Sequence, residues 1–138
     1  MRKTLGIAAA VAVLACGHAA AAGITKDEYK AGLARIATDY QAARQKCGPG
    51  TANATDVCVA QARGAQKAAR AELDAAYKPS PRAYYKAAAA RAEAEYGVAK
   101  QKCDYQKDGD TRAACLKDAG AQRERAKSEA KSAAATPR

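Results

Sequence analysis

Four cysteines are the residues of this chain whose type and spacing most clearly predict a chemistry. Ten residues separate Cys47 from Cys58, and eleven separate Cys103 from Cys115. Zinc ribbons space their paired cysteines about two to four residues apart, and the chain has no Cys-x-x-Cys redox pair. Disulfides are therefore favoured over zinc binding. Four cysteines allow three pairings, and the repeat described below selects Cys47–Cys58 and Cys103–Cys115.

The remaining reactive side chains form no catalytic set. The single histidine, His18, lies in a segment that we expect to be removed, so a mature chain would have no base for a Ser-His-Asp or Cys-His mechanism. Residues 104–109 follow the start of a calcium loop, but its twelfth position is Cys115 rather than glutamate. We interpret that segment as a polar turn. We expect a protein that is not an enzyme and that binds no metal and no cofactor.

Residues 1–22 have the three-part pattern of a secretory signal peptide. Arg2 and Lys3 precede an apolar run over residues 5–15, and small residues lead to a cleavage position after Ala22. The run is too short for a permanent membrane helix, and no later segment approaches that apolar length. The segment ending at Cys16 also resembles a bacterial lipobox. We therefore expect export to the periplasm, with acylation of Cys16 and a tether to the outer membrane as the alternative.

The segment after residue 22 contains a tandem repeat. A shift of 56 positions aligns the tyrosines and the first cysteine of one half with those of the other, and one inserted residue then aligns Cys58 with Cys115. In each half the apolar residues recur at steps of three and four, which indicates amphipathic helices. These residues are Tyr29, Leu33, Ile36, Tyr40, Ala43 and Cys47, and then Tyr85, Ala89, Ala92, Tyr96, Ala99 and Cys103.

Helix-breaking and capping residues divide the chain into four helices. Gly48-Pro49-Gly50 ends the first helix, and we expect Thr55 or Asp56 to cap the second. Ser80 and Pro81 suit the cap and the first position of the third helix. In the second repeat Gly109 is the expected breaker, with Asp110 or Thr111 as the cap of the fourth helix.

We therefore predict an all-α fold of two tandem antiparallel helical hairpins, each closed by one disulfide. The hairpins would span residues 23–78 and 82–131, joined by a linker over 79–81 and followed by a frayed tail over 132–138. They would pack as a four-helix bundle or move independently about the linker. Alanine supplies 41 of the 138 residues, so the helix seams are thin and the disulfides are needed to stabilise them.

Basic residues give the chain a formal net charge of +10, with 24 Lys and Arg against 14 Asp and Glu. One interpretation is a solvated surface that keeps alanine seams soluble. The alternative is a face that binds anionic polymers or lipid headgroups. Nucleic acid is a poor candidate, because the chain is exported and its charge is spread around the helices. The candidate residues for the binding face are Lys30, Arg44, Arg63, Lys67, Arg70, Lys86, Arg91 and Lys100.

The segments 56–62, 71–73 and 77–81 resemble those of a group of small exported proteobacterial proteins. These proteins are often described as TolA-like or as cell envelope biogenesis proteins. The two cysteine loops and the Tyr-Lys-Pro-Ser-Pro linker carry the resemblance, which covers nearly the whole mature chain. It implies a periplasmic helical protein of undetermined activity.

We expect a structural or interaction module of the cell envelope whose partner is an unknown envelope protein. A role in the response to stress is one form of this function. Two alternatives remain. The basic faces would bind anionic envelope components, or hairpins that open would act as a periplasmic chaperone.

Overall fold

The structure is a computed structural model that describes residues 23–135. The predicted signal peptide, including Cys16, lies outside the described residues, as do residues 136–138. Four helices account for almost all of the described chain: α1 (Lys26–Lys46), α2 (Ala52–Tyr77), α3 (Pro81–Asp104) and α4 (Gly109–Ala135). The described residues contain no strand. The predicted all-α class is confirmed.

Side-chain caps begin the helices of both hairpins. Thr25 and Glu28 form a capping box at α1, in which each side chain accepts a hydrogen bond from the other residue's backbone N–H. This bonding lowers the pKa of Glu28 below its ordinary value. Ser80 caps α3 through the N–H of Ala83, with Pro81 at the first helical position, as predicted.

The second helix of each hairpin begins earlier than the sequence predicted. Thr51 caps α2 through the N–H of Ala54, so Thr55 and Asp56 already lie inside the helix. Asp108 accepts a hydrogen bond from the N–H of Thr111 at the start of α4. Gly109, the expected breaker, is the first residue of α4, and Asp110 and Thr111 follow it inside the helix.

The end of α4 also differs from the prediction. We expected a frayed tail from residue 132, whereas α4 continues to Ala135. Residues 133–135 are alanines, which have the highest intrinsic preference for the helix, so the last turn forms without a seam residue.

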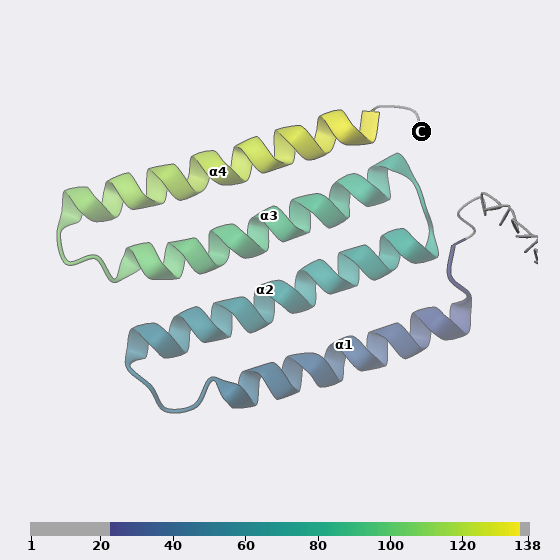
Figure 1. Cartoon of the computed structure of the whole chain (residues 1–138), viewed down its shortest axis with the longest axis horizontal. Coiled ribbons are helices and arrows are strands. Elements are labelled where there is room, and N and C mark those ends of the chain that lie inside the picture. Colours follow the sequence, from purple (N-terminus) through teal and green to yellow (C-terminus); the bar gives the residue numbers. More distant parts are fainter. Residues whose placement is uncertain (1–22, 136–138) are drawn as a thin grey trace, which may run out of the picture.

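The four helices lie side by side in one layer, in the order of the sequence (Figure 1). Each helix packs antiparallel to its neighbour, and the packed pairs in the described chain are α1–α2, α2–α3 and α3–α4. The two hairpins therefore pack together through α2 and α3. Because α1 and α4 do not meet, the bundle is open and both broad sides of the layer face solvent.

Both predicted disulfides are present. Cys47 and Cys58 join the facing ends of α1 and α2, with Cα atoms 5.5 Å apart. Cys103 and Cys115 join α3 to α4 in the same way, with Cα atoms 5.6 Å apart. Each bond thus closes the loop of one hairpin.

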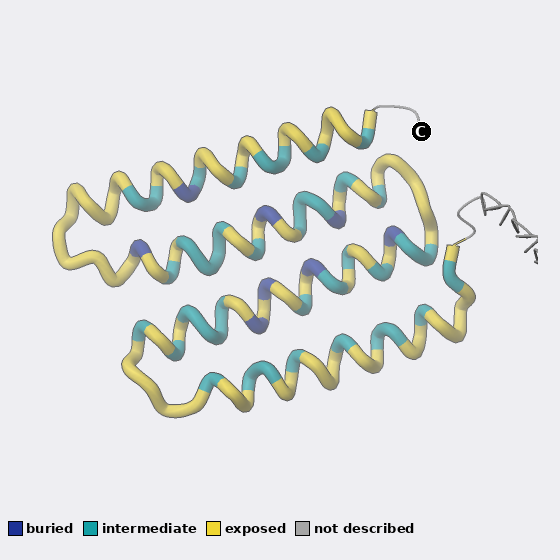
Figure 2. Tube along the Cα trace, in the orientation of Figure 1, coloured by how far each residue is buried: buried dark blue, intermediate teal, exposed yellow. Residues whose placement is uncertain are grey.

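The buried core consists of small residues. Apart from Gly64, its members are Ala62, Ala68, Ala75, Ala87, Ala92, Cys103 and Ala119. They lie on α2 and α3, with Ala119 on α4. Figure 2 shows the buried positions along α2 and α3, whereas α1 has half-buried and exposed residues and none that is buried. The predicted seam residues of α1 and α3 are all half-buried or buried.

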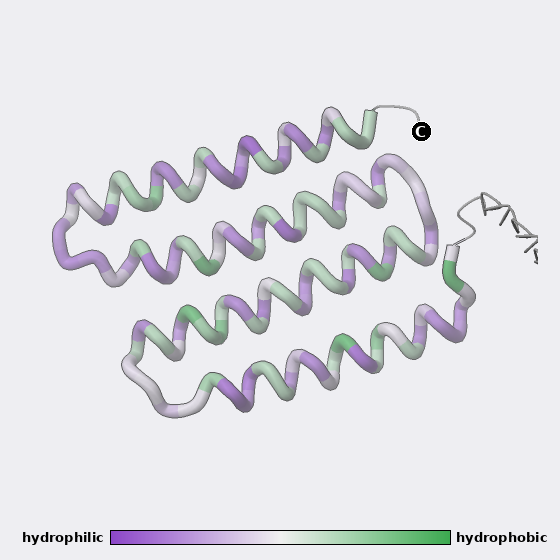
Figure 3. The backbone as a smooth tube through the Cα atoms, viewed as in Figure 1, coloured by the Kyte–Doolittle hydropathy of each residue, from purple (hydrophilic) through white to green (hydrophobic). Residues whose placement is uncertain are grey.

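Small residues at the α2–α3 contact let the two backbones approach closely. A Cβ atom added to Gly64 would lie 2.8 Å from the Cβ of Ala94 and 3.1 Å from its Cα. Hydrophilic and hydrophobic residues alternate along every helix (Figure 3). No helix in residues 23–135 has the length and apolar character that crossing a membrane requires.

Candidate anion-binding groove

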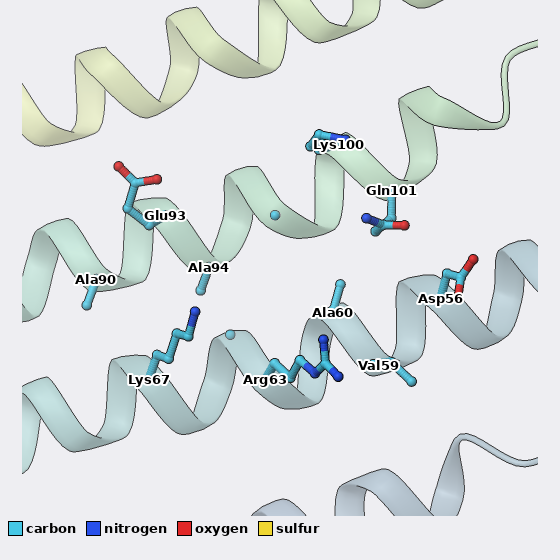
Figure 4. A pocket seen from close by; sticks show the side chains of 12 residues that line it. Asp56, Val59, Ala60, Arg63, Lys67, Ala90, Glu93, Ala94, Lys100 and Gln101 are labelled. Atoms are coloured by element: carbon cyan, nitrogen blue, oxygen red, sulfur yellow. The ribbon is translucent and has the colours of Figure 1, made fainter.

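A groove of about 440 Å³ runs between α2 and α3 on one broad side of the layer (Figure 4). Its walls carry three of the basic residues that the sequence singled out, Arg63, Lys67 and Lys100. Asp56, Glu93 and Gln101 supply the other polar groups. The remaining lining residues are Val59, Ala60, Gly64, Ala90, Ala94 and Gly97.

Arg63 and Lys67 come from successive turns of α2. A separation of four residues places side chains on the same face of a helix, one above the other. Both side chains are exposed, and neither forms an ion pair with any described residue. They are therefore available to an anion from solution.

Lys100 comes from α3 and already has a partner. Its Nζ lies 2.7 Å from Oδ2 of Asp104, one turn further along the helix. The hydrogen bond and the charge of Asp104 raise the pKa of Lys100, so the lysine is fully protonated at neutral pH.

The acidic groups of the groove are bound by neighbouring residues. Asp56 accepts a 2.7 Å hydrogen bond from the hydroxyl of Tyr105. Glu93 lies within reach of two basic residues of α4, with Lys127 Nζ at 3.1 Å and Arg123 Nη1 at 3.7 Å. The guanidinium of Arg123 also lies 4.4 Å from the centre of the Tyr96 ring. These contacts reduce the repulsion that the two carboxylates would exert on an incoming anion.

The floor of the groove is made of small side chains. Ala90 and Ala94 of α3 face Ala60 and Gly64 of α2, and Gly97 leaves open space where a side chain would stand. Figure 4 shows Lys67 extending from α2 toward α3, with Arg63 lying along α2 beside Ala60. The arrangement can bind an anion electrostatically from several sides.

The structure does not bring all eight predicted basic residues into this groove. Arg91 lies elsewhere and pairs with Glu72 across the α2–α3 contact, which raises the pKa of the arginine. Lys30 and Arg44 are on α1, Arg44 being half-buried. Arg70 follows Lys67 on α2, and Lys86 precedes Lys100 on α3.

The sequence alone does not reveal which non-basic residues line the groove. It also does not reveal the residues that bind the two carboxylates of the groove. The sequence predicts Asp56 only as a helix cap, and no prediction above concerns Glu93. Arg123 and Lys127 were not singled out, because nothing in the sequence shows that a residue 34 positions after Glu93 lies beside it. The regular spacing of Glu93 and Lys100, seven residues apart, is the one available signal that they share a helix face.

The described residues include no group of three or more His, Cys, Asp or Glu side chains that could hold a metal ion. All four described cysteines are in disulfides. Comparison of the sequence with protein-family models and with curated proteins gave no match, and comparison with solved structures gave none either.

Proposed function

We propose that this protein is a non-enzymatic helical interaction module of the bacterial periplasm, as part of the cell envelope. The observation that carries the proposal is that both hairpins are closed by a disulfide. Structural disulfides form and persist in oxidising compartments. The sequence of residues 1–22, with its signal-peptide pattern, supports the same location.

The open layer supports an interaction role. Each helix uses one or two narrow seams of small residues to pack against its neighbours, and the rest of its surface faces solvent (Figure 2). An open layer of this kind presents two extended surfaces and encloses little volume. Such surfaces suit contact with a partner over a wide area.

Export and oxidation can be tested by the intact mass of the protein purified from its native envelope. A chain that begins near Gly23 and has lost four hydrogens to two disulfides would support the proposal. An added acyl mass on a chain that begins at Cys16 would support the lipid-tethered form. A full-length chain with free thiols in the cytosol would contradict both forms.

The interaction role can be tested by photo-crosslinking in living cells. A crosslinking amino acid is placed at Lys67 on the groove side, or at Lys102, which is exposed and lines a hollow away from it. A discrete crosslinked product that forms from one position and not from the other supports a surface-specific contact. If neither position gave a product, a protein partner on these surfaces would be contradicted.

A second candidate function is the binding of anionic envelope components. The groove favours it, because it gathers Arg63, Lys67 and Lys100 while its own carboxylates are bound to other residues.

A further inference from the structure

The groove lies within a larger basic face of the layer. On α2, Arg63, Lys67 and Arg70 are separated by four and three residues, so they share one side of the helix. On α3, Arg82 and Lys86 lie eleven and seven residues before Glu93, and Lys100 lies seven after it, on the side that lines the groove. Basic residues of both helices thus extend the groove along its length.

The outer helices add basic residues to the same face. Lys127 of α4 reaches this side of the layer through its contact with Glu93, and Lys131 follows it by one turn. On α1, Lys26, Lys30 and Arg44 form a stripe beside the α2 seam. Because α1 runs antiparallel to α2 in the same layer, that stripe lies on the same broad side of the layer as Lys67.

We use the name basic face for the side of the layer defined by these residues. They are Lys26, Lys30, Arg44, Arg63, Lys67, Arg70, Arg82, Lys86, Lys100, Lys127 and Lys131.

Every acidic residue that the same spacing places on the basic face has a partner within the protein. Asp74 accepts a 2.7 Å hydrogen bond from the hydroxyl of Tyr29, and Asp104 pairs with Lys100. Glu124 lies 2.8 Å from Arg123. Asp56 and Glu93 are bound as described above. In contrast, Arg63, Lys67, Arg70 and Lys86 form no ion pair with a described residue.

The opposite side of the layer carries little net charge. Helical spacing gives it five basic and six acidic residues, including the ion pairs Arg35–Asp39 and Arg91–Glu72. They are Arg35, Lys46, Arg91, Lys102 and Arg125, with Glu28, Asp39, Glu72, Glu95, Asp118 and Glu129. The net positive charge of the helices is therefore concentrated on one of two extended sides, and the expectation that it is spread around the helices is wrong.

We propose that the basic face docks flat on an anionic lipid bilayer. The inference rests on the proposed interaction role and names its partner. The helices are 21 to 27 residues long, which gives the face a length of about 30–40 Å. Its basic residues are spread over all four helices, so only an extended planar anion can meet them together. A linear polymer could follow the groove but would leave the residues of α1 and α4 unused.

The test measures binding of the oxidised protein, residues 23–138, to vesicles by co-sedimentation over a salt series. We expect binding to phosphatidylglycerol-containing vesicles at low salt, a steep loss as salt increases, and none to pure phosphatidylcholine. The variant Arg63→Gln/Lys67→Gln/Lys86→Gln removes three unpaired charges from the basic face. Its partition coefficient should fall about five-fold per residue, and so about 100-fold in all.

The matched control, Lys46→Gln/Lys102→Gln/Arg125→Gln, removes the same charge from the opposite side. At 0.1 M salt it should change the partition coefficient by less than about two-fold. Its residues are then separated from the docked bilayer by about one helix diameter, roughly 10–12 Å, and the Debye length is about 10 Å. Far-UV circular dichroism establishes that both variants remain helical. Equal losses in the two variants would overturn the assignment to one face.

Two other results would overturn the proposal. One is equal binding to neutral and anionic vesicles, and the other is binding to soluble polyphosphate with none to vesicles, which would assign the face to a linear polymer. If vesicles fail to bind while the native protein is still exported, oxidised and crosslinked to a partner, the lipid inference fails and the interaction role stands.

Discussion

Two tyrosine hydroxyls hold carboxylates of α2 from opposite ends of the molecule. Tyr29 of α1 donates to Asp74, and its ring stacks on Tyr77 with ring centres 4.5 Å apart. Tyr105, in the loop after α3, donates to Asp56 and so connects the second hairpin to the first. Each hydrogen bond, together with the nearby carboxylate charge, raises the pKa of the tyrosine above its ordinary value of 10.0.

These tyrosines make the fold sensitive to alkaline pH. A pKa that is raised in the folded state means that the stabilisation is fully present below pH 10 and is lost as the pH rises through the folded value. We expect the variant Tyr29→Phe/Tyr105→Phe to melt a few degrees below the wild type at pH 8. The difference should shrink as the pH rises above 10.0 and through the raised pKa values of the two wild-type tyrosines.

The measurement is thermal unfolding followed by circular dichroism from pH 8 to pH 12. Tyr40→Phe is the control, because this half-buried tyrosine donates no hydrogen bond to a described residue. A gap between wild type and double variant that stays constant over the whole range would contradict the proposed role of the two hydroxyls.

Among the helices, the α2–α3 pair depends on a glycine. Gly64 lies in the middle of α2, where glycine weakens a helix by about 1 kcal/mol relative to alanine. Gly64 allows α2 and α3 to pack closely, since a Cβ atom at this position would meet the Cβ and the backbone of Ala94. These atoms cannot rotate away, so the two helices would have to separate.

We therefore expect Gly64→Ala to destabilise the protein, by about 1–3 kcal/mol, although alanine is the better helix former. Gly120→Ala is the matched control, because Gly120 lies in the middle of α4 with no neighbour within 4 Å of an added Cβ. It should stabilise the protein by about 0.5–1 kcal/mol. Urea unfolding of both variants checks the pair, and stabilisation by Gly64→Ala would show that the helices do not approach as closely as described.

The periodic features of the helices and the start of α3 could be predicted from the sequence, whereas the starts of α2 and α4 and the lateral arrangement of the helices could not. Seam residues such as Leu33 and Ile36 recur regularly, and Ser80-Pro81 is a strong start signal. Residues 52–54 include no residue of the predicted seam, so the hydrophobic periodicity does not indicate the first turn of α2. For the same reason it does not indicate Thr51 as the cap of this helix. The groove depends on the register of α2 against α3. This register cannot be predicted from the sequence, because the alanines along both helices are alike.

The open layer affects how the whole molecule responds to the loss of a bond. In a closed bundle each helix would have two neighbours, whereas among the described helices α1 packs only on α2, and α4 packs only on α3. Each disulfide attaches one of these outer helices to the central pair. We therefore expect the loss of one disulfide to let only the outer helix that it attaches unfold, while the outer helix at the other edge of the layer stays packed.

The double variant Cys47→Ala/Cys58→Ala is expected to release α1 alone. A disulfide that closes a loop of this length contributes about 3 kcal/mol, which corresponds to roughly 100-fold faster hydrogen exchange in a segment that opens locally. Exchange measured by mass spectrometry should increase in α1 and stay unchanged in α3 and α4. Cys103→Ala/Cys115→Ala should give the reverse pattern, with faster exchange in α4. If either variant exchanged faster throughout all four helices, the layer would unfold as one unit, and the independence of its two edges would be wrong.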